Sequence, residues 1–434
     1  MTAEHTDRTA RITAPAALAD EHVDFRFKGL PPDAQGLTVG ELAAQGRNLF
    51  TGGFTTPVIA LSAERVEHNL DLMAAYTDRH GLVFAPHGKT SMAPALFARQ
   101  IERGAWGVSL AVPHQVRVAR AFGVERVLLA NEVVDAPALR WISRELDAHP
   151  SFRFVCYVDS VRGVELMDEA LRAVGGVRPV DVVVELGAGA GARTGARTEA
   201  DCAAVADAVA ATRTLRLVGV SGYEGEVPDA DPAKVRAWLR RLVALLADFD
   251  AAGRFASLDE ILISAGGSAW FDAVAEVFAE VPELSAPALK VLRSGAYLSH
   301  DVGHYRRVTP FNRVPEEGRL EPAFRLWTQV VSRPSPEQAF VNAGKRDAAY
   351  DLDLPEVQVV RSGRNGELRD ATGITLSALS DQHGWLTTAP EAELEVGDWL
   401  GLGLSHPCTS FDKWQLIPLV EQDGTVRDFV RTYF

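Results

Sequence analysis

Short apolar runs alternate with longer amphipathic stretches between about residue 82 and residue 300. Eight such runs occur, at 81–85, 106–111, 126–131, 152–158, 180–186, 215–222, 260–266 and 289–295. The segments between them, such as 199–212 and 232–253, carry apolar residues at helical spacing. Strands that alternate with helices favour right-handed βαβ units and a parallel sheet. Eight repeats predict an α/β fold of the closed (β/α)8 TIM barrel type, with an open doubly wound sheet as the competing interpretation.

The pattern changes after residue 310, where prolines and glycines separate short β-branched and aromatic runs. This pattern is typical of an all-β domain. We therefore predict a flexible polar leader at 1–22, a segment at 23–54 that joins the β domain, a barrel domain at 55–308 and a C-terminal β domain at 309–434. A helical pattern at 63–80 leads into the barrel.

The composition is that of an ordinary folded protein, with 47% hydrophobic and 24% charged residues in a chain of 434. A net charge of −14 repels phosphate backbones and anionic lipids, so we expect neither nucleic acid nor membrane as a partner. No apolar run has the length of a membrane span, and the N-terminus lacks the pattern of a secretory signal. Three cysteines, Cys156, Cys202 and Cys408, are too few for a disulfide framework, which favours a cytoplasmic location.

Active-site groups of a (β/α)8 barrel come from the loops at the carboxyl ends of the strands. Lys89 follows the first predicted strand, beside His87 and Thr90. A lysine that is partly desolvated there has a depressed pKa and can act as a nucleophile toward an aldehyde. A solvated surface lysine is the alternative interpretation.

Small residues occupy the loops after the seventh and eighth predicted strands, where this fold usually binds phosphate. The sequences are Ala265-Gly266-Gly267-Ser268 and Ser294-Gly295-Ala296-Tyr297. Small residues let backbone N–H groups approach an anion, so the pair of loops predicts a phosphate site, although each alone could be a plain turn. The earlier stretch Gly187 to Ala192 fits a dinucleotide-binding pattern, but the acidic residue expected about twenty residues later is missing, which disfavours nicotinamide binding.

The predicted β domain contains a candidate metal pair, His406 and Cys408. On an extended strand these two side chains would face the same way, and imidazole with thiolate suits Zn²⁺. Two protein ligands leave room for water and substrate, as in a catalytic site. A buried thiol beside an unrelated histidine is the alternative, and His383 is either a further ligand or acid/base group or a solvated loop histidine.

Taken together, PHGKT, GAWGVSLA, RVLLANE, SAGGS, SGAY and the terminal SHPC resemble the D-serine dehydratase-like, D-threonine aldolase-related family. These are fold-type III pyridoxal-phosphate enzymes with an alanine-racemase-like barrel and a metal-binding β domain. The resemblance covers about residues 55–430. It departs from the family at Ala85, where an arginine is frequent, and at Ala296, where an asparagine is common.

The resemblance implies a role for each candidate residue. Lys89 would form the Schiff base with pyridoxal phosphate, while Gly266, Gly267, Ser268, Gly295 and Ala296 would bind its phosphate. Tyr223 would lie near the cofactor ring and Arg193 near its edge. His406 and Cys408 would hold the metal, usually zinc, and would serve either their own barrel or that of a neighbouring copy. Family members of this kind usually form head-to-tail dimers.

The activity implied by the resemblance is that of a lyase on a small D-amino acid. We expect Lys89 to take the α-proton and the metal to assist departure of the β-hydroxyl, giving a keto acid and ammonia. Retro-aldol cleavage of D-threonine-like substrates is the nearest alternative; aldolases of the family carry a carboxylate as the second metal ligand, so Cys408 favours elimination. A racemase would have no obvious use for the metal. A non-catalytic pyridoxal-phosphate protein would lack the β domain.

Overall fold

The computed structural model describes residues 15–434, so most of the predicted leader at 1–22 lies outside the described residues. Its contacts divide the described chain into two compact units. The barrel unit comprises residues 73–89 and 99–295. The β unit comprises the residues up to 72, together with 90–98 and 296–434. The domain boundaries that the sequence suggests at 54/55 and 308/309 remain predictions.

Eight parallel strands form the sheet of the barrel unit, in the order β2-β9-β8-β7-β6-β5-β4-β3. They are β2 (Val83–Phe84), β3 (Val108–Leu110), β4 (Arg126–Glu132), β5 (Arg153–Val158), β6 (Val180–Leu186), β7 (Leu215–Gly222), β8 (Ile261–Ala265) and β9 (Ala288–Leu292). Trp106 N–H donates to Phe84 O and Ser109 N–H to Pro86 O, which joins the first strand to the second. The predicted (β/α)8 barrel is confirmed.

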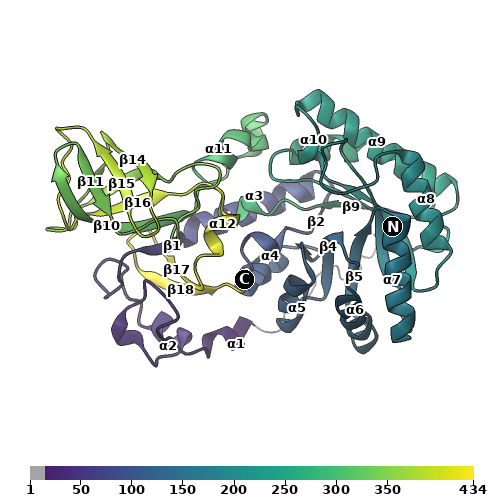
Figure 1. Ribbon diagram of the computed structural model, residues 1–434, viewed down its shortest axis with the longest axis horizontal. Helices are drawn as coiled ribbons and strands as arrows, with labels where there is room; N and C mark the ends of the chain where they lie inside the picture. Colours follow the sequence, from purple (N-terminus) through teal and green to yellow (C-terminus); the bar gives the residue numbers. More distant parts are fainter. Residues whose placement is uncertain (1–14) are drawn as a thin grey trace, which may run out of the picture. The chain divides into compact units, whose positions relative to one another are not determined.

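Helices follow the strands and form the outer layer of the barrel unit (Figure 1). They are α4 (Pro94–Glu102), α5 (Pro113–Ala121), α6 (Ala136–Ala148), α7 (Val161–Val174), α8 (Glu199–Ala210), α9 (Pro232–Ala251) and α10 (Phe271–Phe278), preceded by α3 (Ala63–Arg79). Local sequence sets their ends. Asp135, Ser160, Thr198 and Asp231 each accept a backbone N–H at a helix start, and α7 ends at Gly175 in a left-handed conformation.

The interior of the barrel is a packed apolar core, not a channel. Its residues come from most of the strands and include Leu128, Val155, Val183, Leu262 and Val291, all fully buried. Because this core fills the barrel below the carboxyl ends of the strands, polar groups gather at the rim above it.

The β unit contains a ten-stranded, mainly antiparallel sheet arrangement. Its strands are β1 (Val58–Ser62), β10 (Phe324–Ser335), β11 (Gln338–Val341), β12 (Glu356–Arg361), β13 (Leu368–Asp370), β14 (Ile374–Leu379), β15 (Gly384–Thr388), β16 (Trp399–Gly403), β17 (Leu416–Val420) and β18 (Val426–Arg431). The β-branched and aromatic runs after residue 310 predict seven of these strands, namely β10, β11, β12, β15, β16, β17 and β18. The predicted all-β domain is confirmed. The short strands β13 and β14 were not predicted, and β1 pairs with β10 and β17.

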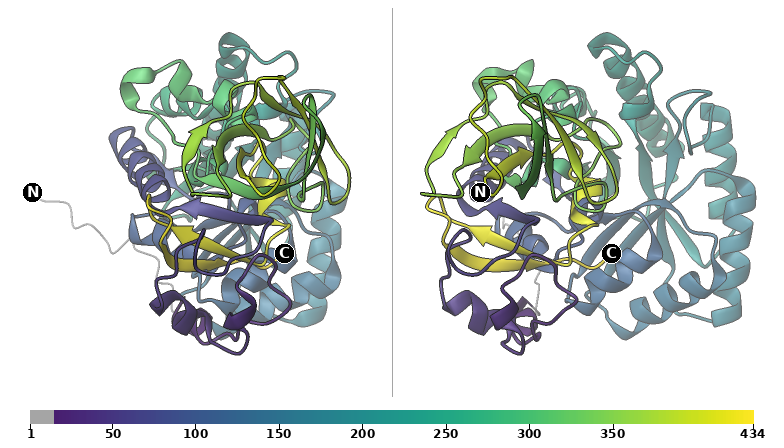
Figure 2. Two further views of the ribbon diagram at one scale, coloured as in Figure 1. Left: turned by 90° about the vertical axis from the view of Figure 1, so that its left-hand side faces the viewer. Right: turned by 60° about the vertical axis from the view of Figure 1, so that its left-hand side comes forward.

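The N-terminal segment packs on this sheet through a shared apolar core. It includes α1 (Pro15–Ala19) and α2 (Val39–Ala44), and it contributes Phe27, Leu42 and Leu49 to a core shared with Trp327 and Phe429. Figure 2 shows this segment, in purple, beside β17 and β18, in yellow. The remaining helix, α11 (His304–Val308), and the short α12 (Cys408–Phe411) lie in connections of the same unit.

Within residues 15–434, no helix combines the length and the apolar character that crossing a membrane requires. The cytoplasmic location and the homodimer remain predictions.

The barrel core makes a first testable prediction. Leu262→Ala removes a fully buried side chain from the barrel interior and should lower the free energy of unfolding by about 2 to 5 kcal/mol, because it leaves a cavity. Urea denaturation followed by circular dichroism measures the change. Val177→Ala, at a side chain that is 88% exposed, is the control and should have little effect. Equal effects of the two changes would contradict the packed core.

Candidate active site

Lys89 lies in a short 3-10 turn, Gly88–Thr90, that follows β2. The chain has six lysines, and Lys89 is the one that lies in a loop after a barrel strand. Its side chain is exposed. The structure therefore places an accessible primary amine at the carboxyl end of the first barrel strand, where the sequence predicted it.

His87 lies two residues before Lys89 and is fixed through its backbone. Its N–H donates to the carbonyl of Arg293 at 3.0 Å, and it forms a parallel bridge with Ser109. Burial, followed by the positive charges of Lys89 and Arg293, holds the pKa of His87 well below its usual value. Its Nδ1 atom is buried and has no hydrogen-bond partner among residues 15–434. His87 is therefore a neutral imidazole with one unused polar atom.

Arg293 directly follows β9 and is 5% exposed. Its Nη1 donates to Ser264 Oγ at 2.6 Å and to Ser221 Oγ at 3.2 Å, and its Nη2 donates to Gly222 O at 2.9 Å. Its guanidinium carbon lies 5.8 Å from the ring centroid of Tyr157. These contacts fix a buried positive charge among the ends of β7, β8 and β9, and sequence reasoning did not single it out.

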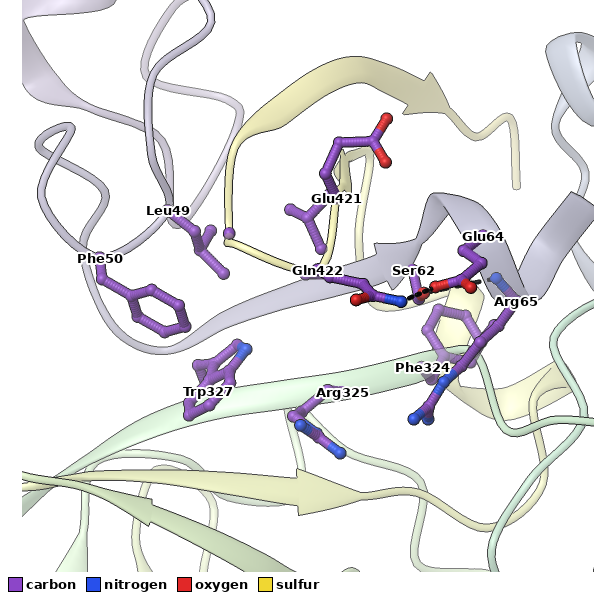
Figure 3. A pocket seen from close by; sticks show the side chains of 14 residues that line it. Leu49, Phe50, Ser62, Glu64, Arg65, Phe324, Arg325, Trp327, Glu421 and Gln422 are labelled. Atoms are coloured by element: carbon purple, nitrogen blue, oxygen red, sulfur yellow. Dashed lines mark hydrogen bonds between the residues drawn. The ribbon is translucent and has the colours of Figure 1, made fainter. Parts of the chain in front are cut away.

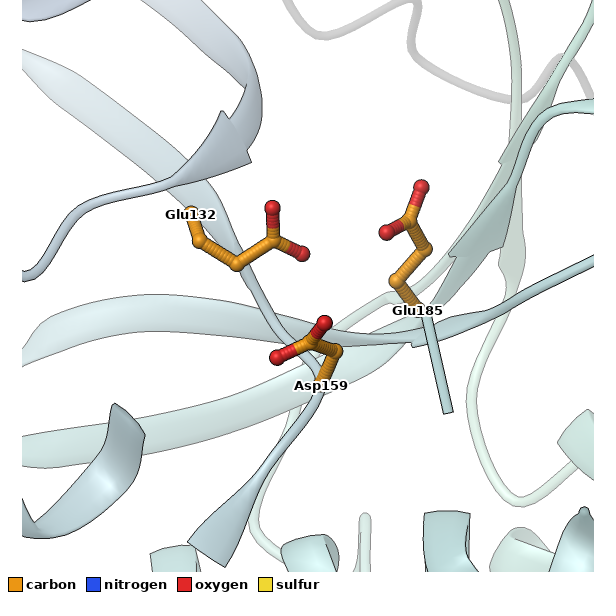
Figure 4. Close-up of side chains that lie close together, drawn as sticks. All are labelled: Glu132, Asp159 and Glu185. Atoms are coloured by element: carbon orange, nitrogen blue, oxygen red, sulfur yellow. The ribbon is translucent and has the colours of Figure 1, made fainter. Parts of the chain in front are cut away.

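Three carboxylates meet at the ends of the neighbouring strands β4, β5 and β6. They belong to Glu132, Asp159 and Glu185, and one oxygen of each lies within 4.8 Å of one oxygen of both others. Figure 4 shows the three side chains pointing toward one another. Asp159 also accepts the backbone N–H of Gly195 at 3.1 Å. We call these three residues the acidic cluster.

Protonation relieves the repulsion within the acidic cluster. Burial, followed by the charge of Glu185, raises the pKa of Glu132 to about 9. Burial also raises the pKa of Glu185, while Arg293 acts in the opposite direction. A buried carboxylic acid that stays protonated at neutral pH can donate a hydrogen bond or a proton at the barrel rim. Asp159 directly follows the predicted strand 152–158, so a search of the strand ends finds it, whereas the two glutamates were not predicted.

The predicted phosphate loop after β8 does contain backbone donors that face an anion. Gly266 N–H donates to Glu224 Oε2 at 2.9 Å and Gly267 N–H to Glu224 Oε1 at 2.5 Å. The anion is therefore an internal carboxylate, which is fully buried. A side chain would not fit at Gly267, because its Cβ would lie 2.7 Å from the Tyr223 ring. Ser268 follows in the same loop and is half-buried.

The second predicted phosphate loop lies against Lys89's own loop. A Cβ at Gly295 would lie 2.5 Å from His87 O, so glycine is required for this close approach. Ala296 begins a 3-10 turn, Ala296–Leu298, and is buried. The residues predicted for phosphate binding thus lie at the carboxyl ends of β8 and β9, as the sequence analysis expected.

Tyr223 and Arg193, predicted near the cofactor ring, contact one another. The guanidinium carbon of Arg193 lies 5.6 Å from the Tyr223 ring centroid, and Arg193 forms an ion pair with Glu226. Burial raises the pKa of Tyr223 to about 12, so the phenol keeps its proton at neutral pH. Their roles toward a cofactor remain predictions.

His406 and Cys408 lie together in the β unit, but the extended strand predicted for them is wrong. Strand β16 ends at Gly403, His406 adopts a left-handed conformation with φ 56°, and Cys408 begins α12. The reason is Pro407, whose φ of −53° and missing N–H suit a helix start and not a strand. The turn still brings the two side chains near one another, so that Cys408 affects the pKa of His406.

Two aspartates hold His406 in place. Asp351 Oδ2 lies 2.5 Å from His406 Nδ1, and Asp301 Oδ2 accepts the His406 backbone N–H at 2.9 Å. The neighbouring Cys408 thiol, followed by the contact with Asp351, raises the pKa of His406 to about 9 although burial opposes it. Thr90 Oγ1 lies 3.3 Å from Cys408 Sγ. His383 is exposed in the turn before β15 and makes none of these contacts.

The missed residues share a recognisable sequence feature. Glu132 is the last residue of β4, Glu185 is the next to last of β6, and Arg293 directly follows β9. A charged residue at the carboxyl end of a buried barrel strand lies at the functional rim, so these positions could have been found by the same search that found Lys89. Asp351 and Glu224 gave no such indication.

The fold and the site together define an α/β barrel with an amine, a buried arginine and an anion-binding loop at one rim, joined to a β unit with a metal-type donor pair. Family models agree with this class. Residues 61–280 match the model described as alanine racemase, N-terminal domain, and residues 323–420 match the model described as putative serine dehydratase domain.

Individual relatives span nearly the whole chain. A D-threonine aldolase from an Arthrobacter species is 27% identical over 385 residues, which are 86% of this chain and 90% of the relative. The crystal structure of D-threonine aldolase from Filomicrobium marinum has a TM-score of 0.72 at 26% identity and covers 88% and 95% of the two chains. D-threo-3-hydroxyaspartate dehydratase from Delftia sp. HT23 has a TM-score of 0.68 at 22% identity, with 89% and 100% covered.

The chain belongs to the alanine racemase N-terminal domain family and carries a D-serine dehydratase-like domain in addition. It is thus a member of the fold-type III pyridoxal-phosphate enzymes and, within them, of the lyases that act on D-amino acids. The predicted family, the enzyme class and the cofactors, pyridoxal phosphate and a divalent metal, are confirmed at this level.

The acidic cluster makes a prediction about stability and pH. The pKa of Glu132 is about 9 in the folded protein, above the ordinary value, so folding stability falls as pH rises between that ordinary value and about 9. Glu132→Gln mimics the protonated acid. At pH 8 it should raise the free energy of unfolding by about 1 to 3 kcal/mol, since each unit of pKa shift is worth about 1.4 kcal/mol. Relaxation of the charged cluster in the parent protein offsets part of that energy.

Urea denaturation of both proteins at pH 5 and pH 8 measures this difference. The gain should be larger at pH 8. Glu283→Gln, at an exposed residue of the barrel unit, should show no such pH dependence. A destabilised Glu132→Gln variant at pH 8 would show that Glu132 is held as a charged group.

Proposed function

We propose that the protein removes the β-hydroxyl and the amino group of a D-hydroxyamino acid, as a D-serine dehydratase does, to give a keto acid and ammonia. The observation that carries this proposal is the placement of His406 and Cys408 in one turn of the β unit, with a thiol and not a carboxylate as the second member of the pair. The proposal includes a small D-amino acid as partner, a homodimer and a cytoplasmic location, with no role for nucleic acid or membrane.

The residues at the barrel rim fit pyridoxal phosphate. Lys89 offers the amine for the aldehyde of the cofactor. His87, two residues before Lys89 in the same loop, has a buried Nδ1 atom without a hydrogen-bond partner among residues 15–434. Gly267 and Gly295 leave no room for a Cβ, which keeps the backbone of both loops close to Tyr223 and to the loop of Lys89. We assign phosphate binding to Gly266, Gly267, Ser268, Gly295 and Ala296, for which Glu224 would have to release the two glycine amides.

The donor set in the β unit fits a zinc-type divalent ion. It offers imidazole, thiol and the Asp351 carboxylate, and two of these are ligands that zinc favours. Support comes from the related D-threo-3-hydroxyaspartate dehydratase, which has been solved as a cysteine mutant in the metal-free form and as a histidine mutant. The two mutated positions are two residues apart, as His406 and Cys408 are.

When bound, pyridoxal phosphate acidifies the Cα–H of an amino acid, and the metal polarises the β-hydroxyl so that it departs as water. The chain's own residues do the rest. The Lys89 amine takes the Cα proton, and neutral His87 accepts or donates a hydrogen bond beside it without adding charge. Arg293 supplies a fixed positive charge at the rim, and Glu132 keeps a proton available there. The released enamine hydrolyses to a keto acid and ammonia.

Retro-aldol cleavage is the second candidate, and the relatives named D-threonine aldolase favour it. This reaction needs a base for the β-hydroxyl proton and breaks the Cα–Cβ bond. Asp351, in contact with His406, is the carboxylate that comes nearest to such a base in the β unit. The two candidates differ in their products, whereas a non-catalytic pyridoxal-phosphate protein would form neither set.

We predict the products accordingly. The protein loaded with pyridoxal phosphate and Zn²⁺ should convert D-serine or D-threo-3-hydroxyaspartate to keto acid and ammonia in equal amounts, and a chelator should remove the activity. Coupled assays for keto acid, ammonia, glycine and aldehyde measure the outcome, with L-serine as the stereochemical control. Glycine and aldehyde as the main products would establish the aldolase instead.

A variant separates the metal role from cofactor binding. Cys408→Ala should lower kcat at least about a hundredfold while it leaves the visible absorbance of bound pyridoxal phosphate in place, because loss of a metal ligand removes leaving-group assistance. Cys202→Ala, at a buried cysteine of α8, is the matched control and should keep full activity. Unchanged turnover of Cys408→Ala would refute the metal role.

A further inference from the structure

A pocket of about 230 Å³ lies in the β unit, apart from every residue assigned above to cofactor or metal. It is lined by β1, β10, the turn between β17 and β18, the start of α3 and residues 49–50. Figure 3 shows Arg325, Trp327 and Phe50 around it. We call it the arginine pocket.

The sequence makes room for an arginine side chain here. Arg325 on β10 pairs with Ala60 on β1, so a small residue stands directly opposite it. On the other side of β10, a Cβ at Gly401 of β16 would lie 2.8 Å from Arg325 Cδ and 2.6 Å from Val359 Cγ1. Alanine on one side and glycine on the other leave the aliphatic part of Arg325 packed on the sheet.

The charge of Arg325 is not compensated within the chain. Its guanidinium makes a long contact of 3.4 Å with Gln358 Oε1, and no ion pair involves it among residues 15–434. Burial, followed by the positive charge of Arg65, lowers the pKa of Arg325. A half-buried guanidinium beside a second one is unfavourable unless an anion joins it.

The acidic residues of the lining do not fill this role. The Glu64 carboxylate accepts a hydrogen bond from the Gln422 amide, and Glu421 lies 3.7 Å from Arg427. Arg65 donates to Pro322 O at 2.8 Å and lies 3.7 Å from Glu321. Each of these charged groups has a partner of its own, which leaves Arg325 as the group that would gain most from an added anion.

Aromatic rings form part of the remaining lining. The guanidinium carbon of Arg325 lies 5.7 Å from the centroid of Trp327, and the Phe50 ring meets Trp327 edge-on at 4.8 Å between centroids. Both rings belong to the apolar layer between the N-terminal segment and the sheet. A pocket that combines apolar and aromatic walls with a few placed charged groups is typical of small-molecule sites.

We propose that the arginine pocket binds a small organic carboxylate, with its anionic end paired to Arg325 and its apolar body against Trp327 and Phe50. A planar carboxylate matches the fork of one guanidinium, whereas the aromatic wall offers nothing to a fully hydrated inorganic anion. Since none of these residues holds the cofactor or the metal, the inference is independent of the proposed lyase activity.

Phenylacetate is the probe, because it joins a carboxylate to one aromatic ring. We expect it to bind the full-length protein loaded with pyridoxal phosphate with a Kd of about 1 mM or tighter, measured by isothermal titration calorimetry. Arg325→Met should weaken phenylacetate binding at least about tenfold. The affinity of Arg325→Lys should lie between those of the parent protein and Arg325→Met. Arg364→Met, at an arginine of the same unit with 80% side-chain exposure, should bind as the parent protein does.

Two comparisons can overturn the proposal. Phenylacetate binding that persists unchanged in Arg325→Met, or equal binding of neutral phenylacetamide, would show that Arg325 does not recognise a carboxylate. Inorganic phosphate that binds more tightly than phenylacetate at this residue would assign a different ligand class. Circular dichroism checks that Arg325→Met folds. Stabilisation by phenylacetate, seen as a raised Tm in the parent protein and absent in the folded variant, gives a second readout.

Discussion

The Arg293 guanidinium lies among the carboxyl ends of β7, β8 and β9, where Ser221, Ser264 and Gly222 O hold it. A closed parallel barrel brings all strand ends to one rim, and a charge buried there affects every titratable group around it. It helps keep His87 neutral and opposes the upward pKa shift of Glu185. The rim thus combines one fixed cation, a neutral imidazole and protonated acid in a small volume, which is the environment that a lysine nucleophile requires.

Much of the fold follows from the length and spacing of apolar runs. The eight barrel strands were predicted because each is a buried run between turn residues, whereas β13 was missed because it is short and gives no apolar pattern. Strand β14 was missed although its buried Ile374 and Leu376 alternate with exposed residues. Lys89 and the two glycine loops were predicted because barrel topology fixes where strand ends go. The hydrogen bonds from the Gly266 and Gly267 N–H groups to Glu224 were not predicted, because they depend on backbone directions that no sequence pattern encodes.

The candidate metal pair illustrates how a residue assignment can start from a wrong local geometry. Alternation on a strand suggested that His406 and Cys408 face the same way, but Pro407 ends the extended backbone and a turn brings them together. Asp301 and Asp351, more than fifty residues earlier in the chain, then fix the backbone and ring of His406. Within one family, the choice between elimination and carbon–carbon cleavage would depend on few atoms: the second metal ligand and the carboxylates near it.

The account rests on Lys89 as the residue that carries the cofactor. The most direct test incubates the protein with pyridoxal phosphate, reduces it with sodium borohydride and identifies the modified peptide by mass spectrometry. The account predicts one pyridoxyl group, on the peptide that contains Lys89, and none after Lys89→Ala. A label on any of the other five lysines, or a protein that takes up no cofactor, would contradict it.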